Sequence, residues 1–549
     1  NTHSAMASDP DSCLPGPLKD FVFDLHDTSR RSQLPIEQAA LYNGTFREIT
    51  AKYFATSAWP SPKSVSSECQ GDELFLALYS ELTLRHWHSV TRPTVKDRIE
   101  GWHTYRALFD ALLKESEDGG GRLFMLPEWA FDVLHEFLYQ FQGFCQYRTG
   151  VFATAAKHAP SADGTPASTT TPTHIVDALA ALTQNRDAWA VETVLFYLHR
   201  LVAIGSTPAA SPAFVYLGMF SSVTLSRLEC LLGDYPASLE ALAPLSSASW
   251  TVTVPTGEGD TVTSTAQEVV HAAFSARLSM AYHAGVSFLM LRRYKDATKE
   301  LADICSFMQR GFKTGQLRKL PGSEQFNKLY DRMLALLAIL THVCPPSGLV
   351  EDGVARAVRE KYGGQLSKIE AGEEGYEDLF IFACPKFIHP AVPDYSQASA
   401  PGAAATVSGP QDSYKLQVQH FMTEMSAQQT MRKLRSYMKL YTSISVGKLA
   451  AFNDMTEAEF LPLLVSYKHK MRQMERTTNT EGDDSLAAAT DGPLGGKLGT
   501  ALDIHYYIVN EMVHVDEAEK QRRFEDYFMA QISQMSEITK HVEAISTVI

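Results

Sequence analysis

The sequence lacks paired cysteines, an excess of positive charge and any long apolar run. Its seven cysteines stand singly with no CxxC pair, so we expect reduced, buried thiols rather than zinc ligands or disulfides. A net charge of −14 argues against a protein whose main task is to coat nucleic acid. No uninterrupted apolar stretch approaches the roughly 18 residues of a membrane-spanning helix, so no membrane segment is expected. With 45% hydrophobic residues in 549, the chain can build several cores.

Motifs for catalysis or metal binding are also missing. His86 and His88 form the only HxH pair, and they lack the downstream Ser and Asp of metal-dependent deubiquitinases. Residues 492–497 resemble a phosphate-binding loop, yet Asp491 stands where its first glycine belongs and Leu498 follows the lysine. HExxH and GxSxG are absent. We therefore expect no enzyme, no metal and no cofactor, and two histidines on an ordinary helix.

Composition divides the chain into helical and low-complexity parts. Residues 1–40 carry several prolines and predict a loosely ordered arm. Apolar residues then recur at helical spacing over 41–156, as in Leu74, Phe75, Leu78 and Leu82, and in Leu134, Phe137, Leu138 and Phe141. Three stretches rich in Ala, Thr, Gly, Pro and Ser, near 157–173, 397–412 and 477–500, are expected to be flexible loops because they cannot bury enough surface.

A weak internal repeat marks the region 174–430. Leu232–Tyr235 and Leu291–Tyr294 each form a tight turn that ends in Tyr between two apolar helical patterns. Such helix pairs are typical of tetratricopeptide-type repeats, whose period is about 34 residues. The longer spacing here is explained by a Ser, Thr and Gly-rich stretch near 246–265. We predict an irregular helical solenoid, in which each pair buries its apolar face against its neighbours.

The pattern changes after Met431. Met431–Tyr441 and Val446–Phe452 predict two short helices, and Thr456 with Glu459 forms a capping box for a third. That third helix presents its apolar side chains at helical spacing, at Phe460, Leu463, Leu464, Tyr467, Met471 and Met474. Two strands then alternate around a turn at Asn510–Glu511, with apolar residues at Ile504, Tyr506, Ile508, Val513 and Val515. Three helices and a ribbon predict a winged helix over 431–516, with 477–500 as an insertion.

A winged helix either binds nucleic acid or docks proteins. The segment from Met431 to Arg476 contains nine basic and four acidic residues, which gives a local net charge of +5. Lys468, Lys470 and Arg472 are therefore candidate RNA contacts. A solvated face, or a face complementary to an acidic partner, explains the same charge, and no aromatic residues interleave with the basic ones. The strand residues Ile504, Tyr506, Ile508, Val513 and Val515 are candidate partner-binding residues of the wing.

The tail over 517–549 predicts one more helix. Its apolar residues step by 4, 4, 3, 3, 4 and 3 positions, at Phe524, Phe528, Ile532, Met535, Ile538, Val542 and Ile545. A sustained period near 3.5 is typical of a coiled-coil seam. The seam either folds back on its own domain or packs against a partner helix, and we expect the partner.

A solenoid that leads into a winged helix and a terminal helix resembles the PCI-domain subunits of the proteasome lid, the COP9 signalosome and translation initiation factor 3. The resemblance extends to short segments of the subunit L family of the eukaryotic factor, which occur in family order over roughly 40–545: Glu136–Gln142, Leu231–Tyr235, Leu289–Ala297, Arg359–Gly363, Cys384–Phe387, Lys439–Thr442 and Tyr467–Met471. The arm and the low-complexity insertions depart from the family and suggest a divergent lineage.

The resemblance implies a mostly α protein and a non-catalytic, cytoplasmic scaffold in a large complex. Proteins of this kind pair through winged-helix edges and C-terminal helices, so subunits K and E of initiation factor 3 are the implied neighbours. The assembled factor binds the small ribosomal subunit, supports formation of the 43S pre-initiation complex and helps to recruit mRNA. A scaffold of the lid or signalosome, and an RNA-contacting winged-helix subunit, are the alternatives.

Overall fold

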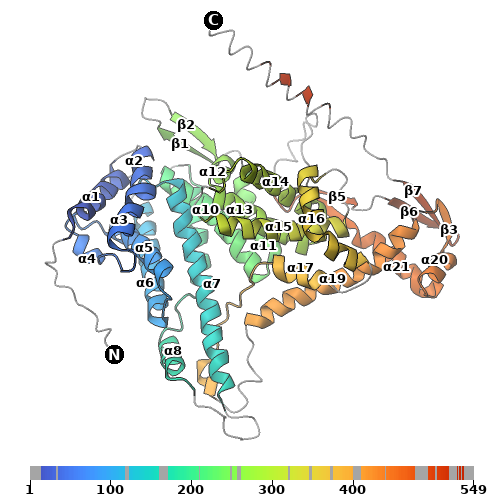
Figure 1. Ribbon diagram of the computed structural model, residues 1–549, viewed down its shortest axis with the longest axis horizontal. Helices are drawn as coiled ribbons and strands as arrows, with labels where there is room; N and C mark the ends of the chain where they lie inside the picture. Colours follow the sequence, from blue (N-terminus) through green and yellow to red (C-terminus); the bar gives the residue numbers. More distant parts are fainter. Residues whose placement is uncertain are drawn as a thin grey trace. The chain divides into compact units, whose positions relative to one another are not determined.

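The protein folds into two compact units, shown by a computed structural model (Figure 1). The structure describes residues 14–31, 35–117, 123–159, 171–208, 210–247, 250–255, 261–318, 322–344, 349–370, 375–399, 410–438, 440–476, 492–500, 504–517, 528, 531–532, 535–536 and 539. Unit 1 comprises Asn1–Leu291, Pro385–His420 and Thr478–Gly495, and unit 2 comprises Arg292–Cys384, Phe421–Thr477 and Gly496–Ile549. The described residues are mostly helical with short strands, so the predicted fold class is confirmed. The unit borders differ from the predicted ones, since 41–156 joins 174–291 in unit 1.

Unit 1 is a stack of helices around α10 (Pro212–Leu232), which packs against α7, α9, α11 and α13. The helices of this unit are α1 (Gly16–Arg30), α2 (Pro35–Ala39), α3 (Phe46–Tyr53), α4 (Pro62–Val65), α5 (Glu73–Val90), α6 (Val95–Glu117), α7 (Pro127–Lys157), α8 (Thr173–Gln184), α9 (Val191–Gly205), α10, α11 (Tyr235–Glu240), α12 (Ala266–Ala272) and α13 (Phe274–Met290). Among the described residues, α10 alone is long and apolar enough to cross a membrane, but 83% of that stretch is buried in the protein. It is a core helix.

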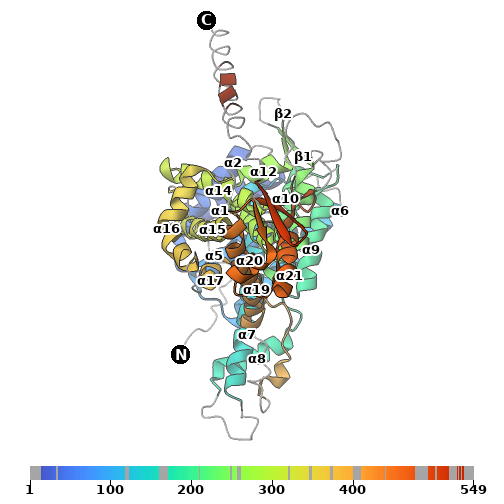
Figure 2. The same cartoon turned by 90° about the vertical axis from the view of Figure 1, so that its right-hand side faces the viewer.

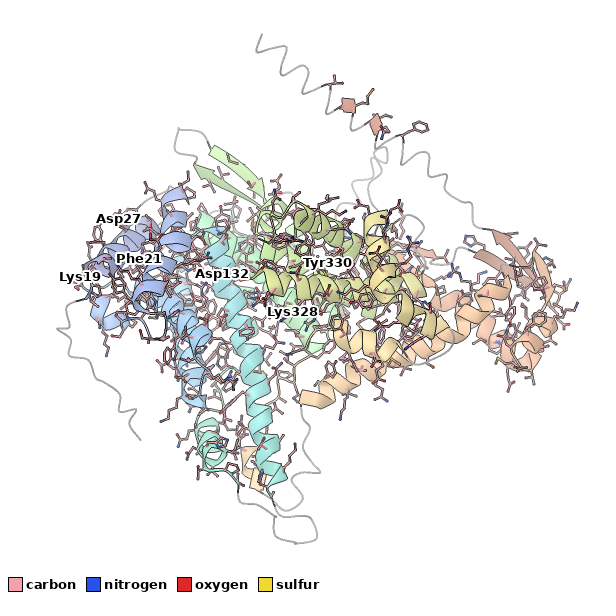
Figure 3. All side chains as sticks on the ribbon, viewed as in Figure 1. Lys19, Phe21, Asp27, Asp132, Lys328 and Tyr330 are labelled. Atoms are coloured by element: carbon pink, nitrogen blue, oxygen red, sulfur yellow. The ribbon has the colours of Figure 1, made fainter. Side chains whose placement is uncertain are left out.

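The N-terminal region is ordered where the structure describes it, and the prediction of a loose arm over 1–40 is wrong for 14–31 and 35–40. Pro17 stands in the first turn of α1, where its missing N–H costs no hydrogen bond. The buried face of α1 includes Phe21 (Figure 3). The ring of Phe21 lies 5.8 Å from that of Trp59. Arg30 at the end of α1 donates to Asp72 at 2.6 Å. The prolines therefore start helices here rather than prevent them.

The two tight turns of the predicted repeat are present. Gly233 takes a left-handed conformation (φ 89°) after α10, and the Asp234 side chain caps α11. The second turn separates α13, which ends at Met290, from α14, which begins at Tyr294. The stretch near 246–265 holds a feature that the sequence did not predict: β1 (Thr251–Pro255) and β2 (Thr261–Thr265) form an antiparallel hairpin that buries Val252.

Unit 2 combines four helices with a small α/β module. Its elements are α14 (Tyr294–Lys313), α15 (Ser323–Val343), α16 (Asp352–Glu370), α17 (Tyr376–Ala383), the part of α19 (Pro410–Met438) from Phe421 onward, α20 (Val446–Phe452), α21 (Glu457–Lys470) and the strands β3 (Ser443–Ser445), β4 (Arg472–Glu475), β5 (Lys497–Thr500), β6 (Ile504–Val509) and β7 (Met512–Glu517). Phe380 of α17 stacks on Phe421 of α19 with ring centroids 3.9 Å apart. The helix predicted over Met431–Tyr441 is thus the end of a much longer one.

The end of the predicted flexible insertion is a strand, so the prediction of a loop over 477–500 is wrong for Lys497–Thr500. These residues form β5, which pairs with β4 in a two-stranded ribbon. Side chains on one face of this ribbon hold it against α14: the Gln473 side chain accepts from the Tyr294 amide at 2.7 Å, and Lys295 donates to Glu475 at 2.6 Å. The stretch packs because it has a partner strand that composition alone does not reveal.

Candidate interaction surface

The predicted winged helix is formed by the end of α19, α20, α21 and a sheet of strand order β3-β7-β6 (Figure 1; Figure 2). Thr456 and Glu459 make the expected capping box, in which Glu459 accepts from the Thr456 amide at 3.2 Å. The hairpin turns at Asn510 and Glu511, whose positive φ values of 49° and 61° suit a two-residue turn. Each of these local signals in the sequence is present at its predicted position.

The inner face of the sheet packs on α21. Phe460, Leu464 and Tyr467 of α21 are buried, and the Tyr506 hydroxyl of β6 donates to the Leu464 carbonyl at 2.7 Å. Tyr467 stacks on Tyr506 with ring centroids 6.4 Å apart. These contacts fix the ribbon on the third helix. Met474, which the sequence assigned to the same helical face, instead lies in β4 and is 38% exposed, because α21 ends at Lys470.

The strand residues predicted as a partner-binding wing lie mainly on this inner face. Tyr506 and Val513 are buried in the module, and Ile508 and Val515 are half-buried. Ile504 belongs to β6, and its side chain lies outside the described residues. The outer face carries other residues, including exposed Tyr507 and Val509 of β6. Alternation along the strands therefore identified the core face, while the face available to a partner has the opposite register.

The three candidate RNA contacts have different roles. The Lys468 ammonium donates to the Tyr506 carbonyl at 2.7 Å and lies 5.4 Å from the centroid of the Tyr506 ring. Lys470 pairs with Glu424 of α19 at 3.2 Å. Arg472 is exposed, with no carboxylate of the described residues within ion-pair distance. Two of the three cations thus hold the module together. The side chains of Arg432, Lys433 and Lys439 are outside the described residues.

Apolar side chains are exposed next to these cations. Leu461 and Val465 on α21 are 42% and 46% exposed. Leu461, Val465 and Lys468 follow one another along the same side of the helix, about one turn apart. Met474 and Leu498, directly paired across the β4–β5 ribbon, add exposed apolar surface. The prediction from sequence overlooked this set because it followed only the buried stripe of α21. The signal was present, since Leu461 and Val465 fall outside the stripe of Phe460, Leu464, Tyr467 and Met471.

The tail seam is described at three of its seven predicted positions. Phe528, Ile532 and Met535 are helical and exposed, at 59%, 60% and 67%. Phe524, Ile538, Val542 and Ile545 lie outside the described residues. Large apolar side chains at 528, 532 and 535 keep the helical spacing that the sequence indicated.

His86 and the described cysteines are buried in unit 1 and unit 2 as parts of the packed structure. His86 of α5 is buried, with its Nε2 2.9 Å from the Phe54 carbonyl oxygen. In the described part of the chain, no group of three or more His, Cys, Asp or Glu residues is arranged to hold a metal ion. The six described cysteines are buried, as predicted, and Cys13 is outside the described residues. Burial raises the pKa of the Cys145 thiol to about 11, which keeps it protonated and unreactive at neutral pH.

The comparisons with known proteins find a family model and several relatives that each match most of the chain. Residues 97–535 match the family model described as RNA polymerase I-associated factor PAF67. Eukaryotic translation initiation factor 3 subunit L of Xenopus tropicalis is 30% identical over 530 residues, covering 92% of this chain and 83% of the relative. The subunit L of Nematostella vectensis is 29% identical over 553 residues, covering 97% and 94%. The chain, with its helical unit and its winged helix, belongs to the family of eukaryotic translation initiation factor 3 subunit L.

Proposed function

We propose that this chain is a non-catalytic scaffold subunit of translation initiation factor 3 in the cytoplasm. In this role it supports assembly of the 43S pre-initiation complex and mRNA recruitment to the small ribosomal subunit through protein–protein contacts. Subunits K and E of the factor are its nearest partners. The names of its relatives support membership in the factor, and the distribution of exposed side chains supports docking as the mode of action.

The observation that carries the proposal is the composition of the third helix of the winged helix. A nucleic-acid-reading helix presents polar and basic side chains to the groove and phosphates. The exposed surface of α21 instead carries Leu461 and Val465, and two cations of its last turn, Lys468 and Lys470, bind a carbonyl and a carboxylate of the protein itself. Exposed apolar residues that form a group are typical of protein-docking surfaces.

The tail is the second docking element in this proposal. Its exposed residues Phe528, Ile532 and Met535 would pack against a helix of a neighbouring protein in the factor. The outer strand β6, with exposed Tyr507 and Val509, would provide a third contact. RNA contact is the alternative function, and exposed Arg472 is the observation in its favour.

Affinity purification of the tagged chain, followed by mass spectrometry, tests the proposal. We expect the subunits of initiation factor 3 in stoichiometric amounts, with K and E retained longest as salt is raised. Recovery of proteasome-lid or signalosome subunits in their place would contradict it. The double variant Ile532→Asp and Met535→Asp should lose these partners, because two charges cannot enter an apolar seam. Gln531→Asp with Ser536→Asp adds the same charge at neighbouring exposed positions and should retain them.

A further inference from the structure

A cleft of about 300 Å³ opens between the end of α21, β5 and β6 in unit 2. Its walls are Lys468, Arg472, Leu498, Gly499, Thr500, His505 and Tyr506. The cleft is present because β5 pairs with β4 whereas β6 pairs with β7, so that the two small sheets are not joined in the described part of the chain. The cleft is therefore lined by residues from four elements, α21, β4, β5 and β6.

The charge of the cleft has one sign. Lys468 and Arg472 bring two cations, His505 adds an imidazole, and no acidic residue is among the described residues that line the cleft. The Lys468 ammonium has three donors, of which the Tyr506 carbonyl uses one. The nearby Glu475 does not neutralise the cleft, because it pairs with Lys295. A negatively charged group is thus the complementary occupant.

Apolar residues extend the surface on both sides of these cations. Leu461 and Val465 continue along α21 from Lys468, since residues 461, 465 and 468 fall within about 60° of helix rotation. On the ribbon, Met474 and Leu498 are exposed and adjacent across the strands, and Leu498 also lines the cleft. We call this set, with Lys468 and Arg472, the α21–ribbon surface. It places two cations between two apolar areas.

We propose that the α21–ribbon surface binds an acidic, amphipathic segment of a partner polypeptide. One carboxylate of that segment enters the cleft between Lys468 and Arg472, and its apolar side chains cover Leu461, Val465 and Leu498. A phosphate backbone fits the surface poorly, because four of its six residues are apolar and offer no partner to phosphate or base edges. This inference rests on the proposed scaffold function and names the kind of segment that the scaffold holds.

Photo-crosslinking in the purified complex tests which class of molecule occupies the surface. The fold should tolerate a photoreactive p-benzoylphenylalanine at position 498, since Leu498 is 63% exposed. After irradiation, we expect one crosslinked partner peptide that carries Asp or Glu within about one helical turn of apolar residues. Crosslinks to ribosomal RNA, to a peptide without carboxylates, or to nothing would each overturn the proposal.

A charge-swap series then tests the ion pairs. Arg472→Glu should weaken binding of a synthetic peptide of the crosslinked sequence on the order of tenfold, and the reversed peptide with Lys at the acidic position should restore it. Lys497→Glu is the matched control, because Lys497 is an exposed cation of the same ribbon that does not line the cleft. Equal losses for the two variants would contradict the proposal. If the variant still co-purifies with initiation factor 3 but loses this peptide, the scaffold function stands independently of the result; if the chain never joins that factor, the scaffold proposal itself fails.

Discussion

Helices α10 and α21 show two different uses of apolar residues in the same chain. From Ala213 to Leu231, α10 is buried on almost every side by the helices of unit 1. By contrast, α21 buries one face and leaves Leu461 and Val465 exposed beside basic residues. Both helices are rich in apolar residues, yet only α10 buries nearly all of its apolar side chains within its own unit. The remaining apolar surface of α21 is what a docking function requires.

The difference also appears in how each helix treats charge. Arg227 of α10 is half-buried in unit 1 and donates to the ring nitrogen Nδ1 of His135 at 3.1 Å, and desolvation lowers the pKa of its guanidinium to about 10. The cations at the end of α21 lie at the surface of the module. Perturbing α10 should therefore damage the fold, and perturbing the exposed part of α21 should damage binding. Three changes sharpen this contrast.

The largest expected effect comes from Gly205→Ala, at the crossing of α9 and α10. A Cβ at this position would lie 2.5 Å from the Phe214 carbonyl oxygen and 2.8 Å from the Gly218 Cα, which are backbone atoms that cannot rotate away. We expect the free energy of unfolding to fall by about 3 kcal/mol, the upper range for overpacking. Urea denaturation followed by circular dichroism measures it.

Gly150→Ala in α7 is the matched control for this substitution. No neighbouring atom of the described structure lies within 4 Å of the point that a Cβ would occupy here, so the added methyl meets open space. The same change should stabilise by about 0.5–1 kcal/mol, because Ala loses less backbone entropy than Gly in a helix. Similar effects at the two positions would mean that α9 and α10 do not approach each other this closely.

The second effect concerns pH and the buried polar end of α10. Burial, and then the charge of Arg227, lowers the pKa of His283 in α13 to about 3, while its Nδ1 lies 2.7 Å from the Ser279 carbonyl oxygen. In the unfolded chain the pKa is about 6.5. Above pH 6.5 the His283 ring is neutral in both states, so its contribution to the free energy of unfolding does not change with pH. Below that pH, the unfolded chain binds a proton that the folded one refuses, so the free energy of unfolding drops by about 1.4 kcal/mol per pH unit.

Replacing the ring tests this contribution. His283→Phe should make the pH dependence between pH 7 and pH 5 shallower by about 2 kcal/mol in total, whatever its effect on stability at pH 7. Chemical denaturation at several pH values gives the slope. An unchanged slope would show that the folded protein accepts the proton at this site.

The same contrast explains which features were predictable from sequence. Local signals were sufficient for the winged helix: the Thr456 capping box, the Asn510–Glu511 turn and the alternation of β6 and β7 each depend on a few neighbouring residues. Non-local pairing was not predictable. Lys497–Thr500 forms a strand only because β4 lies beside it, and the prolines of residues 14–40 gave no sign that Phe21 packs against Trp59.

The candidate site was predicted less well, for a related reason. Alternation gives two faces of a strand but does not say which face the helices cover, so Tyr506 and Val513 were assigned to a partner although their own module buries them. Charge counting identified Lys468 and Lys470 but could not reveal that the Tyr506 carbonyl and Glu424 bind them. Exposure is a property of the packed structure, and it is what adds Leu461, Val465, Met474 and Leu498 to the α21–ribbon surface.

The smallest expected effect separates the two faces of β6 with a single oxygen atom. Tyr506→Phe removes the hydroxyl that donates to the Leu464 carbonyl, so this buried oxygen loses one hydrogen bond. The free energy of unfolding should therefore fall by about 1 kcal/mol. Tyr507→Phe, one residue later on the exposed face, should change it by less than about 0.5 kcal/mol. Thermal unfolding of the two variants measures both. A larger loss at 507 would reverse the register of β6, and the inner face would then be the one offered to a partner.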